Sequence, residues 1–123
     1  MSTHTQQTAL DHLRAFIENL SPISAESWQQ LTPALTTLTF RKKEELLQTG
    51  QVCQALFFIS SGYCRAFYDK DGQDINTAFF FEGEIATNIN SFGTGEPSVF
   101  TIQACETVTV VKFDKAALYT AAK

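Results

Sequence analysis

From Leu38 to Phe113 the sequence alternates short β-forming segments with turn-forming residues, at a spacing of roughly 8 to 15 residues. The β-forming segments are residues 38–40, 45–48, 55–59, 63–68, 75–81, 99–105 and 108–113. The turn-forming positions are Gly50, Ser61 with Gly62, residues 69–72, Gly83 and residues 93–97. This pattern predicts about seven or eight antiparallel strands, and eleven phenylalanines are available to fill the interior. We therefore expect a mainly β fold, a small jelly-roll barrel.

The segment before the barrel carries helical signals. Five apolar residues recur at helical spacing within residues 6–20, and Ser21 with Pro22 ends that helix. These residues are Ala9, Leu13, Phe16, Ile17 and Leu20. Ser24 predicts the N-cap of a short second helix, which Pro33 ends.

The length of 123 residues fits one domain with a single core. We divide it into a helical segment at residues 1–35, the barrel at residues 36–113 and the start of a C-terminal helix at residues 114–123, which Asp114 caps. Phe79, Phe80 and Phe81 cannot all face inward, because neighbouring strand residues point to opposite sides. We expect Phe80 to pack under a helix.

Composition excludes several classes of protein. The longest apolar runs are too short to cross a bilayer and the N-terminus is polar, so we expect a cytoplasmic protein without a membrane span. Cys53, Cys64 and Cys105 form no Cys-x-x-Cys pair, which favours buried free thiols over disulfides, zinc or an iron–sulfur cluster. The net charge of -4 argues against nucleic-acid binding by this chain alone. Residues 41–43 are basic but precede two glutamates, which predicts a solvated turn.

Two stretches carry more specific patterns. Residues 45–74 read ELLQTGQVCQALFFISSGYCRAFYDKDGQD, and residues 79–118 read FFFEGEIATNINSFGTGEPSVFTIQACETVTVVKFDKAAL. The first resembles the opening strands, and the second the phosphate-binding cassette, of a cyclic-nucleotide-binding domain of the Crp-Fnr regulator type. The resemblance implies the sensory domain of a transcription regulator. In that family a dimer helix and a helix-turn-helix DNA-binding domain follow the barrel, and neither falls within these residues.

The resemblance also implies which positions contact a ligand. Relatives that bind cyclic AMP or GMP begin the cassette with Gly-Glu-(Leu/Ile), whose glutamate holds the ribose, and later carry Arg-(Ser/Thr)-Ala, whose arginine pairs with the phosphate. With Gly83 on the glycine that precedes the cassette, these positions hold Thr87, Asn88 and Ile89, then Ser98, Val99 and Phe100. Alternatively, residues 83–86 match the cassette start. Neither alignment supplies the arginine.

The charges of this region also argue against a bound phosphate, independently of the resemblance to a family. Between Asp71 and Val111 the sequence has no Lys, Arg or His and six carboxylates: Asp71, Asp74, Glu82, Glu84, Glu96 and Glu106. The hydroxyls of Thr87, Ser91 and Ser98 could hydrogen-bond an anion. Loss of an arginine contact removes about 1.5 to 3 kcal/mol, so binding of a cyclic nucleotide should weaken roughly tenfold to over a hundredfold.

Three candidate contact residues, Arg65, Asn88 and Ser98, also have ordinary structural explanations. Arg65 is the only plausible anion contact, but on its strand it shares a face with Tyr63 and Phe67, over which an outward arginine commonly lies. Asn88 and Ser98 are also residues that cap loops by bonding to nearby backbone.

Three functions remain to be weighed. We favour a regulatory domain with an unidentified small-molecule effector, part of a homodimer that reaches DNA only through a domain outside this sequence. A structural or dimerisation barrel without ligand is the alternative. An enzyme on the related cupin barrel is disfavoured, because His4 and His12 precede the barrel and leave no imidazole for a metal or beside a nucleophile. We expect no cofactor.

Overall fold

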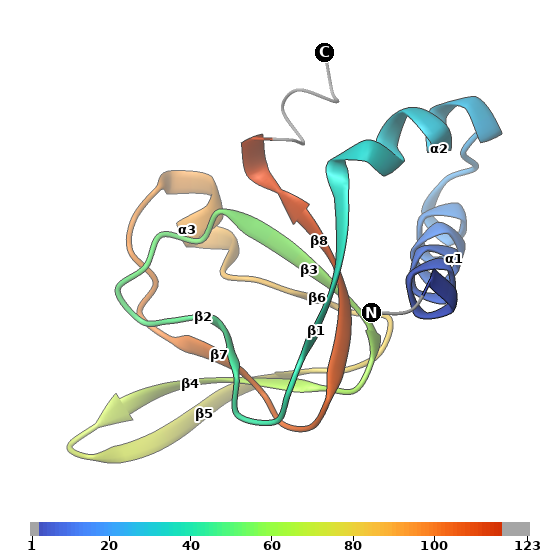
Figure 1. Cartoon of the computed structure of the whole chain (residues 1–123). Coiled ribbons are helices and arrows are strands. Elements are labelled where there is room, and N and C mark those ends of the chain that lie inside the picture. The colour runs from blue at the N-terminus through green and yellow to red at the C-terminus, as the bar shows by residue number, and fades with distance from the viewer. Residues whose placement is uncertain (1–2, 117–123) are drawn as a thin grey trace.

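A computed structural model describes residues 3–116 of the chain, with eight strands and three α-helices in that range. The helices are α1 (Thr3–Leu20), α2 (Ala25–Leu31) and α3 (Ile89–Thr94), with a 3₁₀ turn, η1 (Thr32–Ala34), after α2. The strands are β1 (Leu35–Phe40), β2 (Glu45–Leu47), β3 (Ala55–Ser61), β4 (Cys64–Lys70), β5 (Gln73–Phe80), β6 (Ile85–Ala86), β7 (Thr101–Ala104) and β8 (Val108–Asp114). Figure 1 shows their arrangement.

The strands form two four-stranded antiparallel sheets, with the orders β1-β8-β3-β6 and β2-β7-β4-β5. Strands that are distant in sequence therefore pair, as β1 does with β8 and β4 with β7. The sheets enclose one apolar cluster, to which Phe57, Ile59, Ile102 and Val110 belong. The fold is the expected mainly β jelly-roll barrel.

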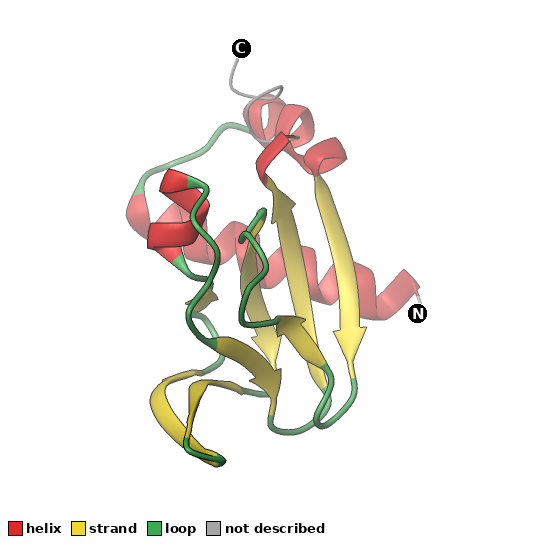
Figure 2. Ribbon diagram, turned by 90° about the vertical axis from the view of Figure 1, so that its left-hand side faces the viewer, coloured by secondary structure: helices red, strands yellow, loops and turns green. Residues whose placement is uncertain are grey.

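Helix α1 covers the outer face of the β1-β8-β3-β6 sheet, across which it runs in Figure 2. Side chains alternate along β8, so Val110 faces the barrel interior and Val111 faces α1. Leu13 of α1 is fully buried, and the Phe16 and Phe58 rings lie 5.2 Å apart. This second cluster fixes the helix to the barrel wall.

Most element boundaries follow the predicted signals. The Ser24 hydroxyl accepts a hydrogen bond from the Ser27 amide at 3.0 Å, which confirms the predicted N-cap of α2. Pro33 lies in η1, directly after α2. Strand β1 begins at Leu35, earlier than the predicted strand at residues 38–40. Strand β6 and helix α3 are additions that the sequence pattern did not assign.

The three consecutive phenylalanines face in alternate directions, as expected for a strand. Phe80 packs against the barrel-interior cluster, while Phe79 and Phe81 are 45% and 53% exposed. The expectation that Phe80 packs under a helix is therefore wrong. Phe79 and Phe81, on either side of it, are the two phenylalanines that face solvent.

The cysteines are free, but they are not all buried. Cys53 and Cys64 lie in the interior cluster, whereas Cys105 is half-buried, so the expectation of a buried thiol fails at that position. The Ala116 amide donates to the Asp114 carboxylate at 3.2 Å, in the manner of the predicted cap, and residues 117–123 of the expected helix lie outside the described range. Among the described helices, none is long and apolar enough to cross a membrane.

Candidate ligand-binding cassette

Helix α3 and its flanking loops form the candidate cassette. Asn88 is the N-cap of α3, and its side-chain oxygen accepts the Ser91 amide proton at 3.1 Å. Gly95 ends the helix in a left-handed conformation, with φ of 81°, where glycine carries no steric penalty. The local sequence thus specifies a short helix between Asn88 and Gly95.

The start of α3 bears on the two possible alignments of the cassette. Residues 85 and 86 form strand β6, which pairs with Phe57 and Phe58 of β3. The helix begins only after Asn88, so a helical cassette start coincides with Thr87, Asn88 and Ile89. In the first alignment the cassette start lies at the N-terminus of α3, whereas in the second it lies in the turn before β6 and in β6 itself.

Asn88 and Ser98, at the aligned positions of the glutamate and the arginine, contact each other. The Asn88 side-chain NH₂ donates to the Ser98 hydroxyl oxygen at 2.9 Å, and that hydroxyl donates to the Phe100 carbonyl at 2.7 Å. The two residues are only 6% and 2% exposed. A buried, uncharged hydrogen-bonded pair therefore links the two positions that the sequence alignment above assigns to the charged residues of the cassette.

The other cassette hydroxyls also have partners within the protein. Thr87 donates to the Ala55 carbonyl at 3.2 Å. The Ser91 hydroxyl donates to the Glu96 carbonyl at 2.5 Å and accepts from the Cys53 amide at 2.8 Å. A hydroxyl has one proton to donate, and in this conformation each proton is given to a carbonyl. An anion would have to displace these bonds before it could use the hydroxyls.

The two apolar candidate positions, Ile89 and Val99, point to solvent. Ile89, the first residue of α3, is 70% exposed, and Val99, directly after Ser98, is 75% exposed. Each therefore lies beside a member of the buried Asn88–Ser98 pair. Two exposed apolar side chains at the cassette provide a surface that a ligand or a neighbouring element can cover.

Arg65 does not join the cassette. Its guanidinium donates to the Gln103 side chain at 2.9 and 3.1 Å and to Asn76 at 3.0 Å, and it forms an ion pair with Asp74 at 3.2 Å. It also lies 4.0 Å from the centre of the Phe67 ring. These contacts hold it on the outer face of β4, whereas its neighbours Cys64 and Ala66 face the interior.

One cation does reach the cassette helix, from a part of the sequence that the charge argument did not cover. The Lys115 ammonium donates to the Phe92 carbonyl of α3 at 2.5 Å and lies 5.2 Å from the Phe92 ring. The predicted cation-free stretch ends at Val111, so sequence distance concealed this contact. The return of β8 brings the lysine to α3.

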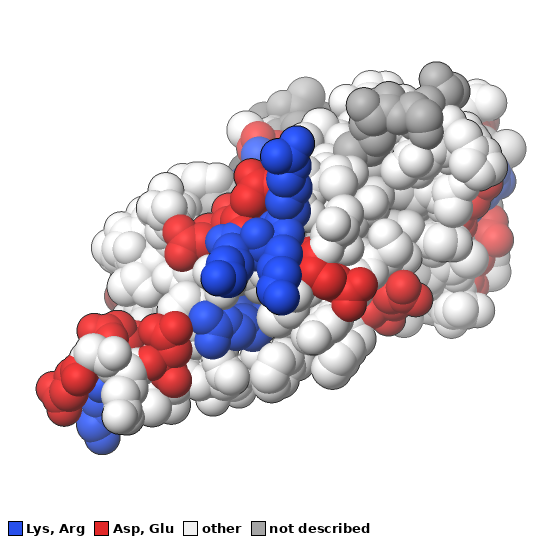
Figure 3. Space-filling view, turned by 60° about the horizontal axis from the view of Figure 1, so that its bottom comes forward, with Lys and Arg blue, Asp and Glu red and all other residues white. Residues whose placement is uncertain are grey.

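The basic turn at residues 41–43 forms a separate feature. All three side chains are exposed, and the Arg41 amide donates to the Glu44 carboxylate at 2.6 Å. Figure 3 shows Lys and Arg side chains gathered on one face, with acidic residues on both sides of them. The mixed charge confirms a solvated turn and does not amount to a large basic patch.

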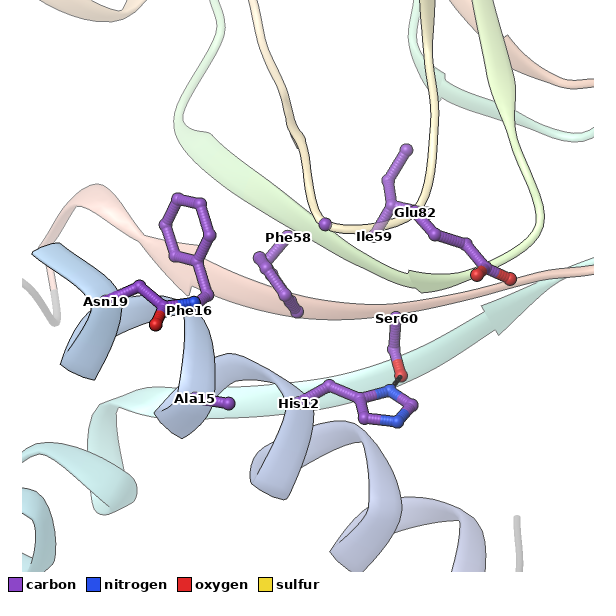
Figure 4. A pocket seen from close by; sticks show the side chains of 9 residues that line it. His12, Ala15, Phe16, Asn19, Phe58, Ile59, Ser60 and Glu82 are labelled. Carbon is purple, nitrogen blue, oxygen red and sulfur yellow. Dashed lines mark hydrogen bonds between the residues drawn. The ribbon is translucent and has the colours of Figure 1, made fainter.

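A hollow of about 470 Å³ lies between α1, β3 and the turn after β5. His12 of α1 and Ser60 of β3 meet there, with 2.7 Å between Nδ1 and the hydroxyl oxygen (Figure 4). The expectation that no serine has an imidazole beside it is therefore wrong, because α1 folds back along β3. The pair alone is not a catalytic centre, since a nucleophile also requires a base oriented by a third group and stabilisation of the developing oxyanion.

Cys64 and Cys105 are poor candidates for chemistry that requires a thiolate at neutral pH. Burial raises the pKa of Cys64 to about 12, with a smaller contribution from the neighbouring Cys105. Burial also raises the pKa of Cys105, against the opposing effect of Arg65. Within residues 3–116, no group of three His, Cys, Asp or Glu side chains is placed to hold a metal ion.

Comparison with known proteins identifies the family. The family model for the cyclic nucleotide-binding domain matches residues 37–123, so the chain belongs to that family. A curated relative, the cAMP-dependent protein kinase regulatory subunit of Debaryomyces hansenii, is 28% identical over 102 residues. That match covers 80% of this chain and 21% of the relative.

Two solved structures represent its structural neighbours. The sensor domain of the transcriptional regulator DNR from Pseudomonas aeruginosa is 18% identical, with a TM-score of 0.74 and coverage of 99% of this chain and 80% of that one. The regulatory subunit of a cAMP-independent protein kinase A from Trypanosoma cruzi, bound to guanosine, is 20% identical. Its TM-score is also 0.74, with coverage of 97% and 42%. The fold thus occurs in both transcription regulators and kinase regulatory subunits.

Proposed function

We propose that this chain is the sensory domain of a Crp-Fnr-like transcription regulator and that its effector is neither cyclic AMP nor cyclic GMP. The observation that carries the proposal is the buried Asn88–Ser98 pair, which is neutral and already hydrogen-bonded. A cyclic phosphate placed there would lose its solvation and gain no guanidinium. Without the guanidinium, binding loses about 1.5 to 3 kcal/mol of free energy relative to a site with a charge-assisted pair.

The candidate ligand positions remain Thr87, Asn88, Ile89, Ser98 and Val99, with an uncharged ligand as the best match. An uncharged molecule needs no cationic partner and can lie against the exposed Ile89 and Val99 side chains. The Trypanosoma cruzi neighbour, which is cAMP-independent, was solved with the uncharged nucleoside guanosine. We therefore include a nucleoside among the probes.

The wider role of the chain follows from the same proposal. A regulator of this kind works as a homodimer in the cytoplasm and contacts DNA through a separate domain. The barrel itself performs no catalysis, and it needs neither a cofactor nor a metal. The alternative role, a dimerisation barrel without ligand, is favoured by the exposed apolar side chains at Ile89 and Val99.

Isothermal titration of the chain with cyclic AMP, cyclic GMP and guanosine tests the proposal. We expect no saturable heat from either cyclic nucleotide at micromolar concentration. Tight binding of a cyclic nucleotide to the unmodified chain would contradict the proposal. A dimer by light scattering together with no response to any probe would favour the assembly role instead.

A pair of variants tests whether the missing charges are the cause. Asn88→Glu combined with Ser98→Arg introduces the charged pair and should strengthen cyclic AMP binding by roughly tenfold or more. The matched control, Asn90→Glu combined with Thr94→Arg, places the same charges at exposed positions of α3. Circular dichroism verifies that both variants fold. An equal effect of the two double variants would show that general charge, and not the cassette, controls affinity.

A further inference from the structure

An exposed aromatic surface lies at one end of the β2-β7-β4-β5 sheet, away from the cassette. Three turns meet there: Gly62 and Tyr63 before β4, Phe81 and Glu82 after β5, and Glu106 after β7. Together these five residues line a hollow of about 340 Å³, which we name the Tyr63–Phe81 hollow.

Its aromatic rings stack in solvent. Tyr63 and Phe81 lie 5.7 Å apart with 25° between their planes, and Phe81 and Phe79 lie 6.2 Å apart with 20° between theirs. Phe79 and Phe81 stay 45% and 53% exposed. Large apolar side chains that remain exposed and adjacent to one another are typical of an interaction site.

Glu82 and Glu106 line the same hollow as Tyr63 and Phe81, and Glu82 also lines the hollow between α1 and β3. The ion pairs within residues 3–116 are Arg14 with Glu18 and Arg65 with Asp74, so neither carboxylate has a cation within bonding distance there. In Figure 4 the Glu82 carboxylate extends away from Phe16 and Asn19 of α1.

The walls of the hollow are held in place by the fold. A Cβ on Gly62 would lie 2.5 Å from the Thr107 carbonyl, so the turn before β4 packs directly against the turn that carries Glu106. The Cys105 amide donates to the Tyr63 carbonyl at 3.0 Å. The Phe81 amide donates to the Glu84 carboxylate at 2.7 Å, which fixes the third turn. The backbone of the three turns is thus fixed by contacts within the fold.

We propose that the Tyr63–Phe81 hollow docks an arginine side chain from a basic segment of a partner protein. A planar guanidinium can pack against the exposed part of the Tyr63 and Phe81 side chains and donate hydrogen bonds to Glu82 and Glu106 at the same time. Within the molecule, Arg65 already makes this kind of contact with Phe67 and Asp74. Aromatic faces combined with carboxylates are complementary to a cation and repel an anion.

The test is an NMR titration of the ¹⁵N-labelled chain with two peptides. One is a pentapeptide amide with two arginines separated by glycine, and the other is the same peptide with citrulline, which keeps the shape and lacks the charge. We expect saturable shifts of the Gly62, Tyr63, Glu82 and Glu106 amides with the arginine peptide. Binding should weaken at least about fivefold with citrulline, and also as salt rises.

Variants separate the hollow from general charge effects. Glu82→Gln combined with Glu106→Gln, and separately Phe81→Ser, should each weaken binding about fivefold or more. The controls are Glu96→Gln for the loss of a carboxylate and Val99→Ser for the loss of an exposed apolar side chain, and both should leave binding unchanged. Three results would each overturn the proposal. One is that Glu96→Gln weakens binding as much as the Glu82→Gln, Glu106→Gln double variant does. The others are shifts spread over the whole surface, and no saturable shift up to millimolar peptide. A cyclic nucleotide result in either direction does not bear on it, because the hollow and the cassette share no residue.

Discussion

Asn88 makes two buried hydrogen bonds, and replacing it with alanine removes both. The first satisfies the Ser91 amide at the start of α3, and loss of such an N-cap costs about 1 kcal/mol. The second reaches the Ser98 hydroxyl, and a buried bond of that kind contributes about 1 kcal/mol. Asn88→Ala should therefore lower the free energy of unfolding by about 2 kcal/mol.

Asn88→Asp distinguishes the two contributions. Aspartate is as good an N-cap as asparagine, but it cannot donate to Ser98. The Ser98 hydroxyl proton is given to the Phe100 carbonyl, so the new carboxylate would face an oxygen lone pair in a buried position. We expect a loss of at least about 1 kcal/mol, because the bond is lost and a charge is buried.

Urea unfolding followed by circular dichroism measures both effects as shifts of the midpoint at constant slope. Asn90→Ala is the matched control, since Asn90 lies on the same helix and is exposed. Exposed substitutions usually change stability by no more than about 0.5 kcal/mol. If Asn88→Ala is as stable as Asn90→Ala, the inference that a locked neutral pair holds the cassette is wrong.

Three further predictions concern the frame of the barrel. Gly62→Ala should destabilise the chain by several kcal/mol or prevent folding, because φ is +85° and the new Cβ would meet the Thr107 carbonyl. Gly72→Ala is the control, because Gly72 has the same φ but open space around it. Thermal unfolding should show a smaller loss of stability for Gly72→Ala. Ser91→Ala should cost about 1 to 3 kcal/mol in urea unfolding, because it leaves the buried Cys53 amide without its acceptor. The free energy of unfolding should fall as pH rises from about 9 to about 12, which is the range between the ordinary and the raised pKa of Cys64. Cys64→Ala should remove the part of this pH dependence that comes from the thiol.

The barrel could be predicted because its signals are local. Glycines at turns take positive φ angles in the structure, as at Gly50 and Gly83, and alternation along the strands decides which phenylalanines face inward. The strand order could not be read from these signals, since the pairing of β1 with β8 joins the two ends of the barrel. Strand β6 escaped prediction because two residues carry no period.

The candidate site divides in the same way. The sequence shows that Asn88 and Ser98 are uncharged, whereas their mutual hydrogen bond depends on how α3 meets the following loop. His12 and Ser60 are 48 positions apart in the sequence, and they meet because α1 folds along β3. Their spacing in the sequence did not indicate this contact.

The amino-acid sequence by itself determined most of the strands, the turns and the lack of a basic residue between Asp71 and Val111, because these follow from the type and order of neighbouring residues. Only the tertiary structure decided that the cassette hydroxyls give their protons to carbonyls, that Lys115 reaches α3 and that Tyr63, Phe81 and Glu106 line one hollow. The physical reason is that hydrogen bonds and stacking act over a few ångströms. Folding of the strands, and not sequence order, decides which groups come that close.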